Sequence, residues 1–162
     1  NEIVPQAVSL LPAESRPKIL HQAGRGNLAE LSAAYKRMGV EAECVEFVDD
    51  MAAVYRDYDI LVCRAGALTI AELAAAGTGA LLVPYPHAVD DHQTANARYL
   101  VSAQAGLLLP QNLLVPEKLA ETIGALTREQ CRQWAENART LAMPHSADDV
   151  ADALIAAAEK AA

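Results

Sequence analysis

Short runs of apolar residues alternate along this chain with longer segments in which apolar positions recur at helical spacing. The clearest example covers residues 60–83, where the apolar run 60–63 predicts a buried strand. Residues 68–76 are rich in strong helix formers, and Gly77 stands where a helix commonly ends. Residues 80–83 form a second apolar run. A strand, a glycine-containing turn, a helix and another strand make one βαβ unit.

The same alternation continues on both sides of this unit. Asn27 is placed to cap one helix, and either Asp49 or Asp50 is placed to cap the next. Strands with short turns and intervening helices predict an α/β fold, a Rossmann-like doubly wound parallel sheet that forms one domain over residues 1–162. The other predicted strands are 18–22, 41–48 and 106–109, and the other predicted helices are 1–11, 27–38, 49–55, 90–104, 116–126, 128–142 and 147–161.

Composition and charge exclude several classes of protein. The chain is 52% apolar, which argues against disorder, and only 4% aromatic, which favours closely packed helices on a sheet. Its formal net charge of −8 argues against nucleic-acid binding, which depends on cationic contacts to phosphate. No apolar run approaches the ~20 residues of a spanning helix. The three cysteines are distant in sequence, and we expect buried free thiols in a reducing, cytosolic setting.

The turn after residues 60–63 is the best candidate for chemistry. In a βαβ unit this turn lies at the carboxyl edge of the sheet, where the free N–H groups of a helix start hold an anion. Gly66 permits close approach of a diphosphate to the backbone, and Thr69 adds a hydroxyl group. Thr69 and Glu72 also fit a capping box, and the spacing alone favours this structural interpretation.

Several ordered blocks carry a family resemblance. The run CRAGALTIAELAAAGTGALLVPYPHAVDDHQTANA, preceded by ILHQAGRG and VEFVDDMAAVY, resembles the MurG family of bacterial glycosyltransferases over essentially the whole chain. The resemblance implies the C-terminal, donor-binding half of a GT-B enzyme that binds UDP-N-acetylglucosamine. In that family the whole enzyme is an inverting hexosyltransferase of peptidoglycan synthesis. It transfers N-acetylglucosamine to lipid-linked N-acetylmuramyl-pentapeptide, converting lipid I to lipid II.

The resemblance also implies a setting for the reaction. The acceptor and the membrane surface belong to the N-terminal half, which we expect to be missing here, so this half alone should be inactive. The parent enzyme is expected to be cytoplasmic and peripheral on the inner face of the bacterial inner membrane. Neither a cofactor nor a metal ion is implied. The remaining alternatives are a separate donor-binding subunit that works with a membrane partner, and a nucleotide-sugar-binding module without transfer activity.

Roles for individual residues follow from the resemblance. The backbone of Val48 would contact the uracil and Met51 would line the base pocket, although core packing is an equal alternative for Met51. Glu72 would accept hydrogen bonds from the ribose hydroxyls, and His92 and Gln93 would contact the sugar. No catalytic residue is assigned. The expected donor-binding set is Val48, Met51, Arg64, Gly66, Ala67, Leu68, Thr69, Glu72, His92 and Gln93, and possible cleft residues are His21, Gln22, Arg25, His87 and Asn96.

Four positions depart from the family pattern. Ala23 and Ala65 stand where serine is usual, Arg25 where lysine is usual, and His92 where a second glutamine is usual. None of these changes removes a backbone donor. An exposed loop cation is the structural alternative for Arg25, and a solvated helix start is the alternative for the segment that contains His92 and Gln93.

The pair Asp57 and Asp59 resembles a metal motif of other glycosyltransferases, but it precedes a strand and therefore belongs to the opposite edge of the sheet. The chain also opens on a predicted helix without the strand that a doubly wound fold places before it. In the usual order 3-2-1-4-5-6 this missing first strand is central. We therefore expect a gap between the strands at 18–22 and 60–63, and either low stability or a gap filled by another segment, a partner chain or a shifted strand.

Overall fold

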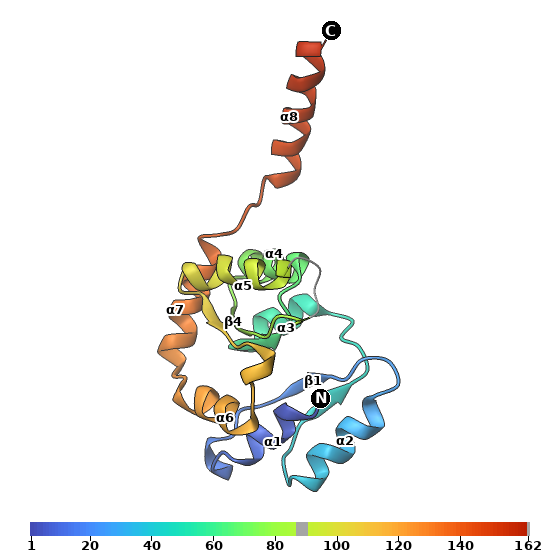
Figure 1. Ribbon diagram of the computed structural model, residues 1–162, viewed down its shortest axis with the longest axis vertical. Helices are drawn as coiled ribbons and strands as arrows, with labels where there is room; N and C mark the ends of the chain where they lie inside the picture. Colours follow the sequence, from blue (N-terminus) through green and yellow to red (C-terminus); the bar gives the residue numbers. More distant parts are fainter. Residues whose placement is uncertain (87–90, 162) are drawn as a thin grey trace.

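The computed structural model describes residues 1–86 and 91–161 of the chain (Figure 1). Every strand pair in this part of the chain is parallel. The strands are β1 (Leu20–Gln22), β2 (Glu43–Val45), β3 (Ile60–Cys63), β4 (Gly79–Leu82) and β5 (Gly106–Leu108). The helices are α1 (Ile3–Ser9), α2 (Leu28–Arg37), α3 (Met51–Asp57), α4 (Ala67–Ala76), α5 (His92–Ser102), α6 (Pro116–Ala125), α7 (Arg128–Arg139) and α8 (Ser146–Ala161), with 3₁₀ turns at Ala13–Ser15 and Gln111–Leu113.

The strands form two sheets, one of order β1-β2 and one of order β3-β4-β5. Placed side by side as β2-β1 and β3-β4-β5, they match the predicted sheet with its central strand left out. Among the strands that the structure describes, none pairs with both β1 and β3. The prediction that another segment of the chain would fill this position is therefore not met within the described residues.

The three-stranded sheet carries helices on both faces. Ala80 and Leu82 of β4 point into a core cluster with α4 and α5. Leu81, between them, points into a second cluster with α1 and α6. Strand residues alternate between the two faces of a sheet, so this division confirms the doubly wound arrangement (Figure 1).

The two-stranded sheet packs mainly against α2. Leu31 and Tyr35 of this helix are buried in a third cluster that includes Ala23, at the end of β1. Helix α1 connects the two parts of the molecule. Its Val8 belongs to this third cluster, whereas its Ala7 belongs to the cluster beneath the three-stranded sheet.

Several predicted helix ends are confirmed and one is not. Gly77 ends α4 with a left-handed φ of 69°, and the Asp50 carboxylate caps α3 by accepting from the Ala53 N–H at 2.9 Å. Asn27 precedes α2 but makes no capping bond. Its side-chain amide instead donates to the carbonyls of Ala23 and Arg25.

The cysteines are free, as predicted, but not all are buried. Cys131 is buried, whereas Cys44 and Cys63 are only half-buried. The expectation of buried thiols is therefore wrong in part, because β2 and β3 each lack full cover on one side. Burial still raises the pKa of Cys63 to about 12, so its thiol is a poor nucleophile near neutral pH.

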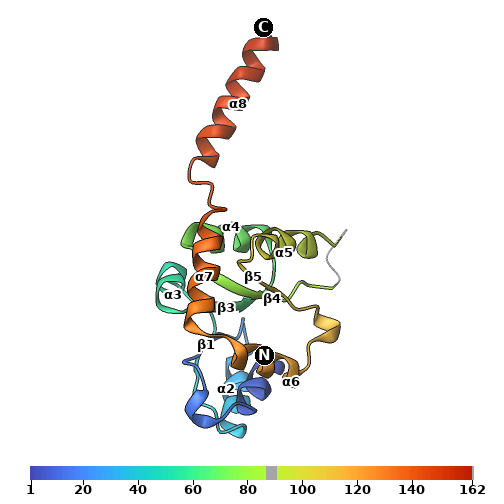
Figure 2. The same cartoon turned by 90° about the vertical axis from the view of Figure 1, so that its left-hand side faces the viewer.

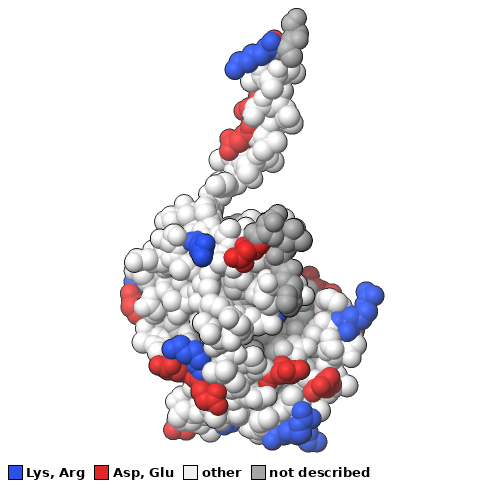
Figure 3. All heavy atoms as spheres, in the orientation of Figure 1, with Lys and Arg blue, Asp and Glu red and all other residues white. Residues whose placement is uncertain are grey.

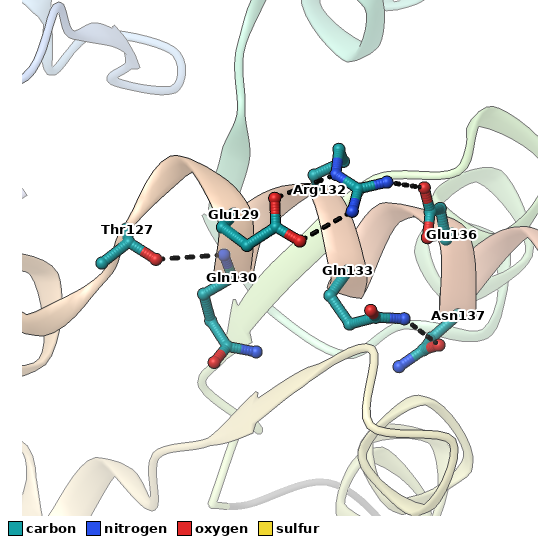
Figure 4. A network of polar contacts seen from close by, with 7 residues as sticks. All are labelled: Thr127, Glu129, Gln130, Arg132, Gln133, Glu136 and Asn137. Atoms are coloured by element: carbon teal, nitrogen blue, oxygen red, sulfur yellow. Dashed lines mark hydrogen bonds and ion pairs between the residues drawn. The ribbon is translucent and has the colours of Figure 1, made fainter.

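Helices α7 and α8 complete the chain (Figure 2). On the solvent side of α7, Arg132 bonds to Glu129 and Glu136, and Gln133 bonds to Asn137 (Figure 4). Helix α8 projects away from the body of the molecule, and its apolar side chains, such as Leu154, are exposed. None of the helices in the described ranges is long and apolar enough to cross a lipid bilayer.

Charged side chains are dispersed over the face shown in Figure 3, where basic and acidic groups lie interspersed. This distribution agrees with the net charge of −8 in giving no broad basic surface on that face for nucleic acid.

Candidate functional site

The carboxyl end of β3 leads through a short turn into the start of α4. Gly66 is the residue before the helix, and no side chain caps this helix start. The first N–H groups of an α-helix have no acceptor within the helix, so those of Ala67, Leu68 and Thr69 point toward the edge of the sheet. This is the geometry that binds anionic groups. The Leu68 side chain, 80% exposed, lies beside this helix start.

Gly66 has an ordinary backbone conformation. Its φ of −65° is open to any residue, and an added Cβ would meet Thr69 Oγ1 at 3.7 Å, an ordinary contact. The fold itself therefore does not require glycine at this position. A ligand that approaches the backbone closely would supply such a requirement.

Arg64 braces the turn from its β3 side. Its guanidinium donates to the carbonyls of Val83 and Pro84, each at 3.1 Å, and lies over the Tyr85 ring. These bonds join the segment after β3 to the segment after β4. Arg64 therefore orients the turn that follows β3.

 Asn96 braces the same turn from α5, because its side-chain amide donates to the carbonyl of Ala65 at 3.0 Å.

The predicted sugar-contacting residues begin α5. His92 is the first residue of this helix and is exposed, and Gln93 follows it. The Gln93 side-chain carbonyl accepts a hydrogen bond from the Tyr85 N–H at 2.9 Å, which leaves its amide nitrogen to act as a donor toward a ligand. The predicted start of this helix at residue 90, and His87, lie outside the described residues.

The predicted base-contacting segment follows β2. The Val48 N–H donates to the side-chain carbonyl of Gln22 at 2.9 Å, so two predicted residues meet here, one at the end of β1 and one after β2. A carbonyl oxygen of a bound base would compete for this same N–H. Met51 is half-buried as the first residue of α3, next to this contact.

Glu72 does not form the capping box that its spacing suggests. Helix α4 begins at Ala67, so Thr69 is already the third helical residue and cannot be the N-cap. The structural alternative for this pair is therefore wrong. The Glu72 carboxylate instead accepts a hydrogen bond from the Tyr55 hydroxyl of α3 at 2.7 Å.

The glycine turn after β1 is held by the segment that follows β2. Gly24 and Gly26 both have left-handed φ values, and the Gly26 N–H donates to the Glu46 carboxylate at 2.5 Å. Arg25, between them, is exposed. The structure therefore presents the Arg25 side chain to solvent at the carboxyl end of β1, which fits the loop-cation alternative as well as a cleft role.

His21 is tied into the body of the protein. Its Nδ1 lies 2.9 Å from the Tyr35 hydroxyl and its Nε2 lies 3.2 Å from the Asn1 side-chain oxygen. Burial lowers the pKa of His21 to about 4. The ring is therefore neutral at physiological pH and its two nitrogens are occupied by structural contacts.

Asp57 and Asp59 lie at the amino end of β3, on the opposite edge from the α4 start, as the sequence predicts. Asp57 pairs with Arg56 and Asp59 with Arg128, both in exposed positions. Within residues 1–86 and 91–161, no group of three or more His, Cys, Asp or Glu side chains is arranged to hold a metal ion.

Two features of this edge were not predicted from the sequence. One is the bond from Tyr55 to Glu72, and the other is the bond from Val48 to Gln22. Both join residues that are distant along the chain, so neither has a spacing signal. For the bond from Tyr55 to Glu72, the sequence indicates only that Tyr55 lies one helical turn after Met51.

Comparison with known proteins identifies the class of domain. Residues 1–154 match the family model of the glycosyltransferase family 28 C-terminal domain. The chain therefore belongs to this family, and the doubly wound fold agrees with it.

Named relatives are similar over almost the whole chain. One relative is the UDP-N-acetylglucosamine–N-acetylmuramyl-(pentapeptide) pyrophosphoryl-undecaprenol N-acetylglucosamine transferase of Neisseria meningitidis serogroup C. The two sequences are 68% identical over 158 residues, and the aligned region covers 98% of this chain and 44% of that protein. It is 51% identical over 161 residues to the enzyme of the same name from Bordetella parapertussis, covering 99% of this chain and 45% of that protein. The chain thus spans less than half the length of these relatives.

A solved structure gives the same result. The crystal structure of Acinetobacter baumannii MurG superimposes with a TM-score of 0.87 at 36% identity, over 93% of this chain and 46% of that one. The predicted GT-B half is therefore confirmed as the fold class.

Proposed function

We propose that this chain binds UDP-N-acetylglucosamine at the carboxyl edge of its sheets. The observation that carries the proposal is the uncapped start of α4, where Gly66 leaves room beside three N–H groups for a diphosphate. The Glu72 carboxylate on the same helix is the proposed acceptor for the ribose hydroxyls, and Val48 is the proposed contact for the base. The similarity to named N-acetylglucosamine transferases supports this choice of ligand.

In the longer protein, we propose transfer of N-acetylglucosamine with inversion to lipid-linked N-acetylmuramyl-pentapeptide. The α4 start would stabilise the negative charge of the departing UDP, which is an electrostatic contribution to catalysis. The acceptor and the general base are assigned to the remainder of that protein or to the cleft between the halves. The reaction would then take place at the cytoplasmic face of the inner membrane, with the protein attached peripherally.

Calorimetric titration of the full-length protein with UDP-N-acetylglucosamine and with UDP tests the binding site. In the Glu72→Ala variant both ligands should bind more weakly, because lost hydrogen bonds to a charged group typically cost about 1.5–3 kcal/mol. Unchanged affinity for both ligands would remove Glu72 from the site.

The sugar contact has its own test. Gln93→Ala should weaken binding of UDP-N-acetylglucosamine and leave binding of UDP nearly unchanged, because only the first ligand carries the sugar. Gln130→Ala, which changes an exposed glutamine on α7, is the matched control and should alter neither. Equal losses for both ligands in Gln93→Ala would place Gln93 away from the sugar.

A further inference from the structure

Glu72 stands on an exposed part of α4, where a carboxylate normally samples several rotamers. In this structure one of its oxygens, Oε2, accepts the hydrogen bond from the Tyr55 hydroxyl at 2.7 Å. A carboxylate has about four lone-pair positions, so one donor leaves the others for further hydroxyl groups. The contact therefore fixes the carboxylate without using up its capacity to accept.

Tyr55 is itself held at both ends. Its ring packs at the margin of the core cluster that α4 and α5 form with the sheet. Its backbone carbonyl accepts a hydrogen bond from the hydroxyl of Thr78 at 3.3 Å, and Thr78 is a buried polar residue two positions after the end of α4. The hydroxyl that meets Glu72 is thus presented from a fixed position.

The Tyr55 hydroxyl is well suited to act as a constant hydrogen-bond donor to the Glu72 carboxylate. Burial, and next the hydrogen bond to Glu72, raise the pKa of Tyr55 above its ordinary value. The phenol therefore keeps its proton throughout the neutral range and donates it to the carboxylate at any pH at which the enzyme would work.

The same contact joins two parts of the candidate site. Tyr55 belongs to α3, which begins at Met51 immediately after the segment of Val48. Glu72 belongs to α4, whose start is the proposed diphosphate site. A single hydrogen bond therefore connects the helix of the base pocket to the helix of the ribose contact.

We propose that Tyr55 is a positioning residue for nucleotide binding, whose hydroxyl holds the Glu72 carboxylate in the orientation that receives the two vicinal hydroxyls of a ribose. This inference rests on the proposed function, because it needs a ribonucleotide at Glu72. A group that is already oriented before the ligand arrives saves the ordering cost of binding, so the contact should increase affinity for ribose in particular.

The test compares UDP with 2′-deoxy-UDP in the full-length protein and in its Tyr55→Phe variant. Phenylalanine keeps the packed ring and removes only the hydroxyl. The variant should lose about three- to tenfold in affinity for UDP, the range expected when one hydrogen bond is removed, and less for 2′-deoxy-UDP, which keeps only the 3′ hydroxyl of the pair. In kinetic assays KM for the donor should rise with little change in kcat, since a ribose contact is made equally in the ground and transition states.

Two controls separate positioning from a loss of fold. Tyr58→Phe removes a hydroxyl next to the end of the same helix, where the ring lies beneath the Lys18 ammonium, and should leave the ratio of the two affinities unchanged. In a Glu72→Ala background, Tyr55→Phe should have no further effect on that ratio. The ratio does not depend on how much of the sample is folded, so it remains informative if the variant is less stable.

The outcomes distinguish this inference from the proposed function. If the unmodified protein binds neither nucleotide, the proposed function fails. If it prefers UDP and the Tyr55→Phe variant retains the full preference, the proposed function stands and the role of Tyr55 is overturned.

Discussion

The two sheets of this molecule consist of strands of similar length but differ in how well they are covered. Every residue of β4 is buried, and helices lie on both faces of the sheet around it. In the β1-β2 pair no residue is buried, and each strand has an exposed residue at one end, Gln22 at the end of β1 and Glu43 at the start of β2. The covered sheet supports the start of α4, whereas the two-stranded sheet supports the segment of Val48. The proposed diphosphate contact therefore lies at the end of the more buried sheet, and the proposed base contact lies at the end of the less buried one.

The largest expected effect concerns β1 and β3, each of which pairs with one neighbour only among the strands that the structure describes. Each additional hydrogen bond between strands contributes about 0.5–1.5 kcal/mol to the free energy of unfolding. A strand that paired with both β1 and β3 would add several of these bonds. In a protein of the length of the relatives, we expect one more parallel strand between them. Hydrogen exchange should then show higher protection at Leu20–Gln22 and Ile60–Cys63 in the longer protein than in the 162-residue chain. Equal protection in both would contradict this account of the split sheet.

The next effect compares a core position in each sheet. Leu82→Ala should lower the free energy of unfolding by about 2–5 kcal/mol, because the side chain is fully buried in the core. Val45→Ala in β2 should cost about 1 kcal/mol, since Val45 is only half-buried. Urea unfolding of both variants measures the difference. Equal losses would show that the two sheets are equally well packed.

Gly106 tests how closely the strands of the covered sheet approach one another. An added Cβ would lie 2.2 Å from the Ala80 carbonyl oxygen of the neighbouring strand. Gly106→Ala should therefore cost about 1–3 kcal/mol or more through overpacking. Gly66→Ala is the matched control, because its Cβ has room, and should leave the melting temperature nearly unchanged. A loss in Gly66→Ala as large as that in Gly106→Ala would contradict the packing described for the two glycines.

The smallest effect is a pH dependence centred on the two-stranded sheet. The pKa of His21 is about 4 in the folded protein, below its ordinary value of 6.5, so the unfolded chain binds the proton more readily. Stability should be complete above pH 6.5 and fall as the pH drops toward 4, by about 1–2 kcal/mol after allowing for the partial exposure of the ring. His21→Gln should flatten this profile in urea unfolding at several pH values. An unchanged slope in the variant would assign the acid sensitivity to other groups.

The sequence predicted the covered sheet better than the exposed one. Strand β3 was predicted with its observed ends and β4 within one residue, because each contains an uninterrupted apolar run of the kind found in parallel sheets that helices cover. The predicted strands at 18–22 and 41–48 were too long, and among the described strands β1 and β2 pair only with each other.

The parts of the candidate site that are formed by consecutive residues could be predicted from the sequence. The turn at Gly66 and the helix after it follow from local patterns, and the structure has them where they were expected. The partner of Glu72 was not predictable, because the Tyr55 contact depends on how two helices pack. Spacing favoured a capping box instead, and the start of α4 at Ala67 shows why that interpretation is wrong.

A crystal structure of the full-length protein with UDP-N-acetylglucosamine bound tests the central claim most directly. The account predicts the diphosphate at the N–H groups that follow Gly66, the ribose hydroxyls on the carboxylate of Glu72, and the base against the backbone of Val48. A nucleotide bound elsewhere, such as in the groove between β5, α6 and α7 that Leu107 and Trp134 line, would contradict it.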